Sequence, residues 1–393
     1  LDLPFSAIGL IWNSMMSVAG GWFFLMACEM FVLEDKDFRL PGLGSYIQTA
    51  SNKGNIEYVL YGLGTMIFLI ILLDILIWRP LIAWSQKFRL DTVPPEEERE
   101  SFILNILTGS SLLKIFSRVV SSLINKIENL SYESLQIYRK SLLNKMSKII
   151  GLALVLTLLF AVVWAIIKAS SILSSITLND IFKILTASFY SFLRTSVALL
   201  IALSWTLPAG VYIGLNPRAA KFLQGIVQIA ASVPATAVFP VILLFLIKLG
   251  GGLDIGAIFL MLLGTQWYLL FNIIAGASAI PKDLIEISRA YKIKGLKKWK
   301  SLILPGIFPY LITGLITASG GAWNATIVSE YVSFGGQMMQ TKGLGALISS
   351  SSAEGNFALL LLSTCMMSII VVSINRVVWK RLFILAKTKY TLE

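Results

Sequence analysis

One stretch of sequence occurs twice in this chain, at positions 301 residues apart. Residues 17–44 read SVAGGWFFLMACEMFVLEDKDFRLPGLG, and residues 318–345 read ASGGAWNATIVSEYVSFGGQMMQTKGLG. The matches are Leu3-Pro4 with Leu304-Pro305, Gly20 with Gly321, Trp22 with Trp323, Glu29 with Glu330, Gly42-Leu43-Gly44 with Gly343-Leu344-Gly345, Gly54-Asn55 with Gly355-Asn356, and Trp78 with Trp379. Tryptophan and glycine are uncommon and the register has no gap, so the sequence predicts two copies of one module.

The composition predicts a membrane protein. Hydrophobic residues make up 56% of the 393 residues, charged residues 14%, and the mean hydropathy is +0.79. A helix that crosses the bilayer needs about 20 apolar residues. About eight stretches meet this requirement, at 5–28, 56–78, 149–168, 195–215, 223–247, 255–275, 306–328 and 357–378. We therefore expect an all-α, polytopic bundle of transmembrane helices.

The repeat divides the chain into three predicted segments. Residues 1–90 are expected to be the C-terminal remnant of a first module with two spans, and residues 149–393 a complete second module with about six. Residues 91–148 are the one long polar stretch and predict a cytoplasmic linker with an amphipathic helix. This linker either is a tether or lays its apolar face on the membrane or the bundle. Both copies have the same predicted orientation, which makes the repeat parallel.

The net charge of +12 follows the predicted topology and does not indicate nucleic acid as a partner. Lysine and arginine are dense at Arg79–Lys148, Arg218 and Lys221, Lys282–Lys300, and Arg376–Lys389. The alternate loops, Glu29–Lys53, Asp180–Lys183, Lys248–Asp254 and Glu330–Glu354, are poorer in them or balanced. By the positive-inside rule the first set is cytoplasmic, and so is the C-terminus.

Several kinds of chemistry lack their usual residues. The sequence has no histidine, and its two cysteines, Cys28 and Cys365, are not equivalent in the repeat. No metal site or disulfide framework is therefore predicted. The phosphate-binding pattern of Gly, four residues and Gly-Lys-Ser/Thr does not occur either. We expect a chain that is not an enzyme and binds no cofactor itself.

The strongest chemical signal is the predicted cytoplasmic loop at 281–305, which reads PKDLIEISRAYKIKGLKKWKSLILP. Its first part can form a helix with one apolar face, and lysines crowd the part that follows. Gly295 is expected to break this helix and Pro305 to end the loop. Such a helix across the end of a bundle is a suitable binding surface for another protein.

This loop resembles that of the inner-membrane permeases of binding-protein-dependent ABC importers. Their pattern is Glu-Ala-Ala, a glycine six residues after the Glu, and a later Leu-Pro. Here Glu286-Ile287-Ser288 and Leu304-Pro305 take the first and last places, while Lys292 replaces the expected glycine. The turn can therefore be shifted toward Gly295. Segments 232–240 and 304–314, Ser329-Glu330 and Gly343-Leu344-Gly345 resemble the nitrate, sulfonate, taurine and bicarbonate branch, and the likeness covers residues 185–393 and 3–90.

The resemblance implies a fused, two-module permease in a prokaryotic plasma (inner) membrane. It would carry a small anion or organic anion delivered by an extracytoplasmic solute-binding protein. Two separate ATPase subunits would bind the ATP, and the loop would dock on them, with membrane lipid around the bundle. The implied loop residues are Glu286 as polar anchor, Arg289, Lys297 and Lys298 as charged contacts, and Ser288, Lys292, Gly295, Leu304 and Pro305. Alternatively, the lysines reflect only the positive-inside bias, and Glu286 only a helix N-terminal charge.

Polar residues within the predicted spans are candidates for lining a pathway. They are Gln228, Gln266, Asn272, Trp323, Asn324, Thr326 and Trp22. The alternative for most of them is hydrogen bonding or packing between helices. Glu29 and Glu330, near the outer ends of equivalent spans, either form an outer gate, contact the binding protein, or cap a turn.

Two other functions fit a polytopic chain. An ATPase-independent secondary transporter or channel would need charged residues within its spans for ion coupling. The predicted spans have almost none, apart from Asp74 and Arg194 near span ends. A membrane scaffold with basic loops for anionic lipid is the third hypothesis. Such a scaffold would not need the repeated Leu-Pro, Trp and Gly-Leu-Gly positions.

Overall fold

A computed structural model describes residues 10–11, 14, 18, 20–22, 25, 28–33, 36–85, 142–334 and 337–390. The chain divides into two compact units, one of Leu1–Asn13 with Leu72–Ser174 and one of Ser14–Ile71 with Ser175–Glu393. Each is described by itself. Residues 91–141 of the predicted linker lie outside the described residues, and so does most of the predicted span at 5–28.

The smaller unit contains the π-helical turn η1 (Asp74–Trp78), helix α4 (Arg79–Ser85) and helix α7 (Leu142–Leu173). Residues 151–173 of α7 are long and apolar enough to cross a membrane, and they include most of the predicted span at 149–168. Asp74 is buried, and its Oδ2 atom accepts a hydrogen bond from Arg79 Nε at 2.9 Å. This charge near a predicted span end is therefore paired with a cation.

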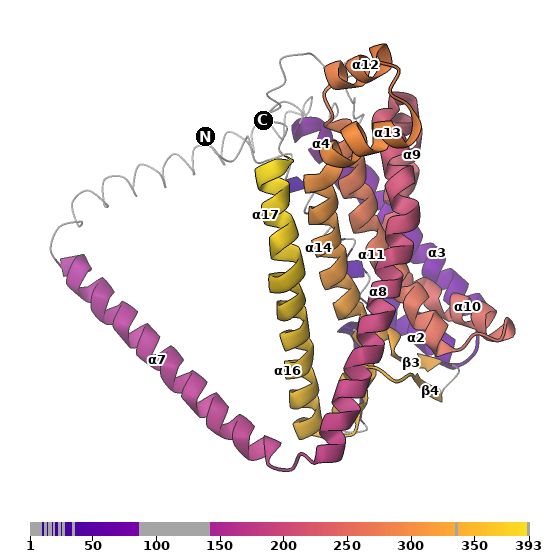
Figure 1. Cartoon of the computed structure of the whole chain (residues 1–393). Helices are drawn as coiled ribbons and strands as arrows, with labels where there is room; N and C mark the ends of the chain where they lie inside the picture. Colours follow the sequence, from indigo (N-terminus) through magenta and orange to yellow (C-terminus); the bar gives the residue numbers. More distant parts are fainter. Residues whose placement is uncertain are drawn as a thin grey trace, which may run out of the picture. The chain divides into compact units, whose positions relative to one another are not determined.

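The larger unit contains three long helices that pack together, α8 (Leu178–Leu215), α11 (Leu253–Ser278) and α14 (Leu304–Ser329) (Figure 1). Glycines bring them close. A Cβ atom at Gly214 of α8 would lie 2.6 Å from the Ile274 carbonyl oxygen of α11, and one at Gly314 of α14 would lie 3.0 Å from Asn272 Cβ. Small residues at such crossings are typical of helices that associate within a membrane.

Six described helical segments are long and apolar enough to span a membrane. They are Ile56–Trp84, Gly151–Leu173, Leu178–Leu215, Leu253–Ser278, Gly295–Ser329 and Phe357–Lys389. The predicted span at 223–247 is instead two shorter helices, α9 (Pro217–Ser232) and α10 (Ala235–Lys248). Pro234 separates them because it has no N–H and disfavours helical geometry at Val233, whose ψ is 123°.

The remaining elements lie at two places in the larger unit. Helix α12 (Lys282–Ala290), helix α13 (Gly295–Lys298) and the π-helical turn η3 (Trp299–Ile303) connect α11 to α14, which we call the loop end. Strands β3 (Tyr331–Phe334) and β4 (Gln337–Gln340) form an antiparallel hairpin after α14, followed by the short helix α15 (Leu344–Ala353). We call this the hairpin end. Figure 1 places the two at opposite ends of α14.

The elements recur at the spacing predicted from the sequence. Strands β1 (Met30–Leu33) and β2 (Lys36–Arg39), helix α2 (Leu43–Asn52) and helix α3 (Ile56–Leu73) are each followed 301 positions later by an element with the same bounds. These later elements are β3, β4, α15 and α16 (Phe357–Ile374). Even the turn η1 has its counterpart in η4 (Asn375–Trp379), which precedes the final helix α17 (Lys380–Lys389). The strand register is also the same, because Met30 pairs with Arg39 and Tyr331 with Gln340.

Candidate functional site

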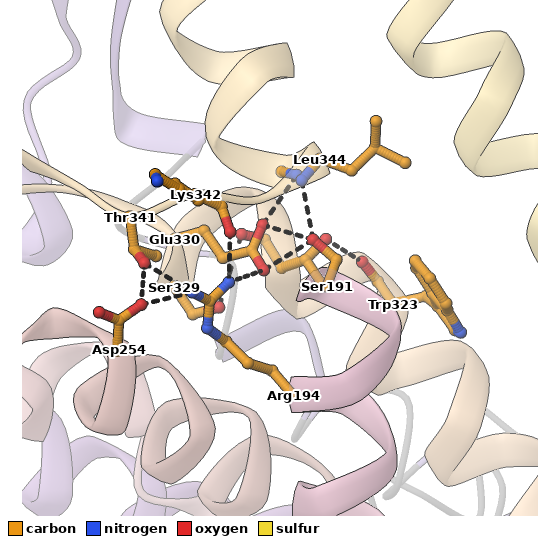
Figure 2. Close-up of polar contacts among 11 residues, drawn as sticks. Ser191, Arg194, Asp254, Trp323, Ser329, Glu330, Thr341, Lys342 and Leu344 are labelled. Carbon is orange, nitrogen blue, oxygen red and sulfur yellow. Dashed lines mark hydrogen bonds and ion pairs between the residues drawn. The ribbon is translucent and has the colours of Figure 1, made fainter. Parts of the chain in front are cut away.

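A buried carboxylate at the hairpin end joins three parts of the chain, the end of α14, helix α8 and the start of α15. Glu330 follows the last residue of α14, and its side chain is 0% exposed. Its Oε1 atom accepts hydrogen bonds from Ser191 Oγ at 2.7 Å and from Arg194 Nη1 at 3.1 Å. Its Oε2 atom accepts one from the Gly345 N–H at 2.9 Å, and Ser191 Oγ lies 2.8 Å away. Figure 2 shows these contacts converging on the carboxylate.

Arg194, in the first half of α8, extends this network to a fourth helix, α11. Its Nη1 atom also donates to the Lys342 carbonyl oxygen at 2.8 Å, and Nη2 donates to Thr341 Oγ1 at 2.6 Å and to the Asp254 carboxylate. The Arg194 side chain is 7% exposed, whereas that of Asp254, at the start of α11, is 72% exposed. A planar guanidinium with five donors can hold two carboxylates and a carbonyl together, which an ammonium group cannot do equally well.

The interactions around Glu330 have opposite effects on the pKa of its carboxyl group. Burial raises the pKa of the Glu330 carboxyl, while the Ser191 hydroxyl, the Arg194 guanidinium and the Gly345 N–H lower it. A buried charge is costly unless it is paired and hydrogen-bonded. Removal of one of these three hydrogen-bond donors is therefore expected to leave much of the cost of burying the carboxylate uncompensated, and so to destabilise the fold.

The first copy of the repeat has a simpler version of the same arrangement. Glu29 Oε2 accepts hydrogen bonds from the N–H groups of Gly44 at 2.7 Å and Ser45 at 3.1 Å, at the start of α2. In both copies the main chain of the glutamate accepts a second bond, from Leu40 N to Glu29 O at 2.8 Å and from Thr341 N to Glu330 O at 3.0 Å. Both glutamates therefore cap the short helix after the hairpin, which is the turn-capping alternative of the sequence analysis.

The capping geometry explains the repeated Gly-Leu-Gly. A Cβ atom at Gly42 would overlap the Glu29 carboxylate, and one at Gly343 would overlap that of Glu330. At Gly345 a Cβ atom would overlap the main-chain carbonyl of Thr326, in the last turn of α14. The glycines thus allow each carboxylate to reach the N-terminus of the next helix.

At the loop end, the turn after α12 is at Lys292. The Lys292 N–H donates to the Arg289 carbonyl oxygen at 3.0 Å and the Ile293 N–H to that of Ser288 at 2.9 Å, which is a Schellman motif. Lys292 has a φ of 53° in the left-handed region that favours glycine. The turn therefore stays at the position where the resembling family has glycine, and a lysine takes the strained conformation. Gly295, with a φ of 56°, starts α13.

The loop presents both apolar and charged side chains to its surroundings. Ile287, Tyr291 and Leu296 are 51%, 78% and 79% exposed, and we call these three the apolar loop patch. The predicted contacts Glu286, Arg289, Lys292 and Lys297 are exposed, Lys298, Leu304 and Pro305 are half-buried, and Ser288 is buried. The loop thus carries large exposed apolar side chains together with basic ones.

The predicted pathway residues lie on several helices. Trp323 is buried among Ile184, Leu344 and Met367. Asn272 and Thr326 are bonded to carbonyls of their own helices, at 2.8 and 2.7 Å, whereas Gln266 Oε1 accepts a hydrogen bond from Trp205 Nε1 of α8 at 3.1 Å. Asn324 is exposed, and Gln228 and Trp22 are half-buried.

Sequence reasoning noted Arg194 but did not pair it with Glu330, and it missed Ser191, Asp254 and Thr341. The sequence did contain one signal that Arg194 has acidic partners. A charge within a span requires a partner, and both Asp254 and Glu330 belong to loops predicted on the same side. The partners are 60 and 136 residues from Arg194 in the chain, so no local pattern connects them.

The chain is similar in sequence to known membrane permeases. Residues 206–382 match the family model described as binding-protein-dependent transport system inner membrane component. The nitrate import permease protein NrtB of Synechococcus elongatus is 24% identical over 188 residues, which is 47% of this chain and 64% of that protein. The putative aliphatic sulfonates transport permease protein SsuC of Escherichia coli is 32% identical over 29% of this chain and 41% of that protein.

Two further similarities concern a bicarbonate system and a solved structure. The bicarbonate transport system permease protein CmpB of Synechocystis is 31% identical over 32% of this chain and 44% of that protein. The chain thus spans between about two fifths and two thirds of the length of these relatives. A chain of the methionine ABC transporter MetNI, solved in an inward-facing conformation, aligns with a TM-score of 0.45 at 19% identity, over 54% of this chain and 99% of that chain.

Proposed function

We propose that this chain is the permease of an ABC importer, with two modules in one polypeptide, because residues 206–382 match the model of the binding-protein-dependent transport system inner membrane component family. The family match carries the proposal. The recurrence of β1 to η1 as β3 to η4, at an offset of 301, supports the presence of both modules that a shared pathway requires. The proposed modules are residues 1–90 and 149–393, connected by the linker at 91–148.

The loop end is proposed to bind ATPase subunits. α12 and α13 carry the apolar loop patch, beside exposed Glu286, Arg289 and Lys297. Burial of three large apolar side chains in a groove supplies affinity, and the charges around them supply orientation. The proposed partners are two ATPase subunits, one for each module. These subunits would bind and hydrolyse ATP, and this chain would act as a permease and not as an enzyme.

The orientation follows from the basic residues. The basic segments Lys282–Lys300 and Arg376–Lys389 support a cytoplasmic location for the loop end and the C-terminus, by the positive-inside rule. The hairpin end then faces outward, where an extracytoplasmic solute-binding protein would dock. Arg194 lies toward this end and is paired with Glu330 and Asp254.

The proposed substrate is a small anion or organic anion. Relatives are named for nitrate, bicarbonate, aliphatic sulfonates and taurine, which share an oxyanion group. The proposed pathway residues are Gln228, Gln266, Asn272, Trp323, Asn324, Thr326 and Trp22, whose polar groups carry no charge at neutral pH. Neutral hydrogen-bonding groups suit passage, since a fixed cation would retain an anion.

Transport by the reconstituted complex tests this function. The complete protein is purified with its ATPase and placed in proteoliposomes with ATP inside, and candidate binding proteins are added outside. Uptake of labelled nitrate, bicarbonate, taurine and an alkanesulfonate is measured with and without ATP. ATP-dependent uptake of one of them, only with its binding protein, supports the proposal. Uptake by the chain alone, driven by a proton or sodium gradient, would contradict it.

A further inference from the structure

A polar contact joins the two copies of the repeat at the hairpin end. Gln48 and Asn52 lie one turn apart on α2, in the first copy, and Ser333 lies on β3, in the second. Gln48 Nε2 donates to the Ser333 carbonyl oxygen at 2.7 Å, and Ser333 Oγ donates to Asn52 Oδ1 at 2.9 Å. Gln48 Nε2 also lies 3.2 Å from Asn52 Oδ1, so the three residues form a closed set. All three are half-buried.

The equivalent contact on the other side of the repeat cannot be made in the same way. α15 contacts β1 just as α2 contacts β3, as a two-fold relation between the copies requires. The residues equivalent to Gln48, Asn52 and Ser333 are Ser349, Ala353 and Val32. Ser349 Oγ donates to the Ile327 carbonyl oxygen of its own copy at 2.9 Å. Alanine and valine side chains have no hydrogen-bonding groups. The three-residue set is thus made between α2 and β3 and not between their equivalents, α15 and β1.

Other contacts between the copies lie near this set. Ala237 of α10 packs into a cluster with Ile47, Val59 and Met66, from α2 and α3. A Cβ atom at Gly20 of the first copy would lie 2.7 Å from the Tyr268 hydroxyl of α11. The polar set is therefore one of several contacts between the first copy and the second.

We propose that Gln48, Asn52 and Ser333 are a latch that holds the outer mouth of the pathway closed between the two modules. This inference rests on the proposed function, because alternating access requires the outer ends of the modules to separate when solute enters. Side-chain hydrogen bonds at a half-buried site are strong enough to bias such an equilibrium and weak enough to break in each cycle. Opening of the outer mouth breaks both contacts of Ser333 together.

Thiol crosslinking tests the latch in the complete protein bound to its ATPase. Cys28 and Cys365, both exposed, are changed to serine, and Asn52→Cys and Ser333→Cys are introduced. A protease site is inserted in the predicted linker, so that a crosslink keeps the two fragments together on a gel. We expect rapid crosslinking without nucleotide and a rate about tenfold lower when ATP and vanadate trap the cycle. Crosslinked protein should lose ATP-dependent uptake and regain it on reduction.

The outcomes separate the latch from the proposed function. A chain that purifies with no ATPase contradicts the proposed function and, with it, the latch. An intact complex whose crosslinking rate does not change with ATP and vanadate, or which transports while crosslinked, overturns the latch alone.

A matched pair of substitutions provides a second measurement. Ser333→Ala removes the hydroxyl that crosses between the copies, while Ser349→Ala removes one that bonds within its own copy. Ser333→Ala is expected to raise ATP hydrolysis in the absence of the binding protein about fivefold, because the closed state loses one hydrogen bond. Ser349→Ala should leave it unchanged. Equal rates in the two variants would overturn the latch.

Discussion

The two repeated glutamates should respond differently to the same substitution, Glu to Gln. A carboxylate offers two acceptor oxygens, while an amide offers one oxygen and an NH₂ donor. At Glu330, Arg194 Nη1 bonds one oxygen and the Gly345 N–H bonds the other. Whichever way the new amide turns in Glu330→Gln, its NH₂ group faces one of these donors. At Glu29, the N–H groups of Gly44 and Ser45 both bond Oε2, so a single amide oxygen can serve both.

The magnitude follows from what each site loses. Glu330→Gln removes one charge-assisted hydrogen bond and leaves the buried Arg194 with Asp254 as its remaining carboxylate, at a cost of about 2–3 kcal/mol in the free energy of unfolding. Glu29→Gln keeps both hydrogen bonds and loses only the favourable charge at a helix N-terminus, about 0.5 kcal/mol. The predicted ratio between the two costs is therefore about fourfold or more.

Unfolding by SDS in mixed micelles, followed by tryptophan fluorescence, measures both variants against the wild type. The predicted result is a clear loss for Glu330→Gln and a small one for Glu29→Gln. A small, equal loss in both would refute the reasoning. It would indicate that the buried Glu330 carboxyl is protonated, since a protonated carboxyl already carries one donor and glutamine would imitate it.

Three further predictions use the same assay. Gly345→Ala should lower the free energy of unfolding by about 2–3 kcal/mol, because its Cβ would overlap the Thr326 carbonyl. The control Gly320→Ala, where a Cβ atom would meet nothing within 4 Å, should be neutral or stabilising. Equal effects of the two substitutions would contradict the packing. Lys292→Gly should stabilise by about 1 kcal/mol by relieving a positive φ, and the control Lys294→Gly, where φ is −129°, should not. Arg194→Lys should lower the free energy of unfolding by about 2 kcal/mol, since one ammonium group cannot keep the contacts to Glu330, Asp254 and Lys342 together. An unchanged midpoint of the SDS unfolding curve would show that these contacts do not stabilise the fold.

The sequence predicted the membrane class and the spacing of the repeat, because both depend on features that a sequence displays directly. Apolar length determines which segments can cross a bilayer, and tryptophans such as Trp22 and Trp323 fix the register between the copies. The break in the span at 223–247 was missed for a physical reason. Hydropathy sums composition over a window, whereas Pro234 acts on the backbone of one residue.

The site was less predictable than the fold. The chain separation between Arg194 and Glu330 is 136 residues, and only packing of α8 beside the end of α14 brings them together. The turn after α12 shows a different limit. Glycine preference indicated a shift toward Gly295, but the Schellman hydrogen bonds hold the turn at Lys292, which tolerates the strained conformation. Local propensity is a weak guide when other interactions determine the backbone.

The central claim is that this chain is driven by a separate ATPase that binds the loop at 281–305. The most direct test is affinity purification of the complete protein from its native membrane in mild detergent, as wild type, Glu286→Lys and Glu354→Lys. Both substitutions reverse the charge of an exposed glutamate, one on the loop and one at the hairpin end. We predict that the wild type and Glu354→Lys carry the ATPase and that Glu286→Lys loses most of it. Purification of all three without an ATPase, in detergent that preserves such complexes, would contradict the claim.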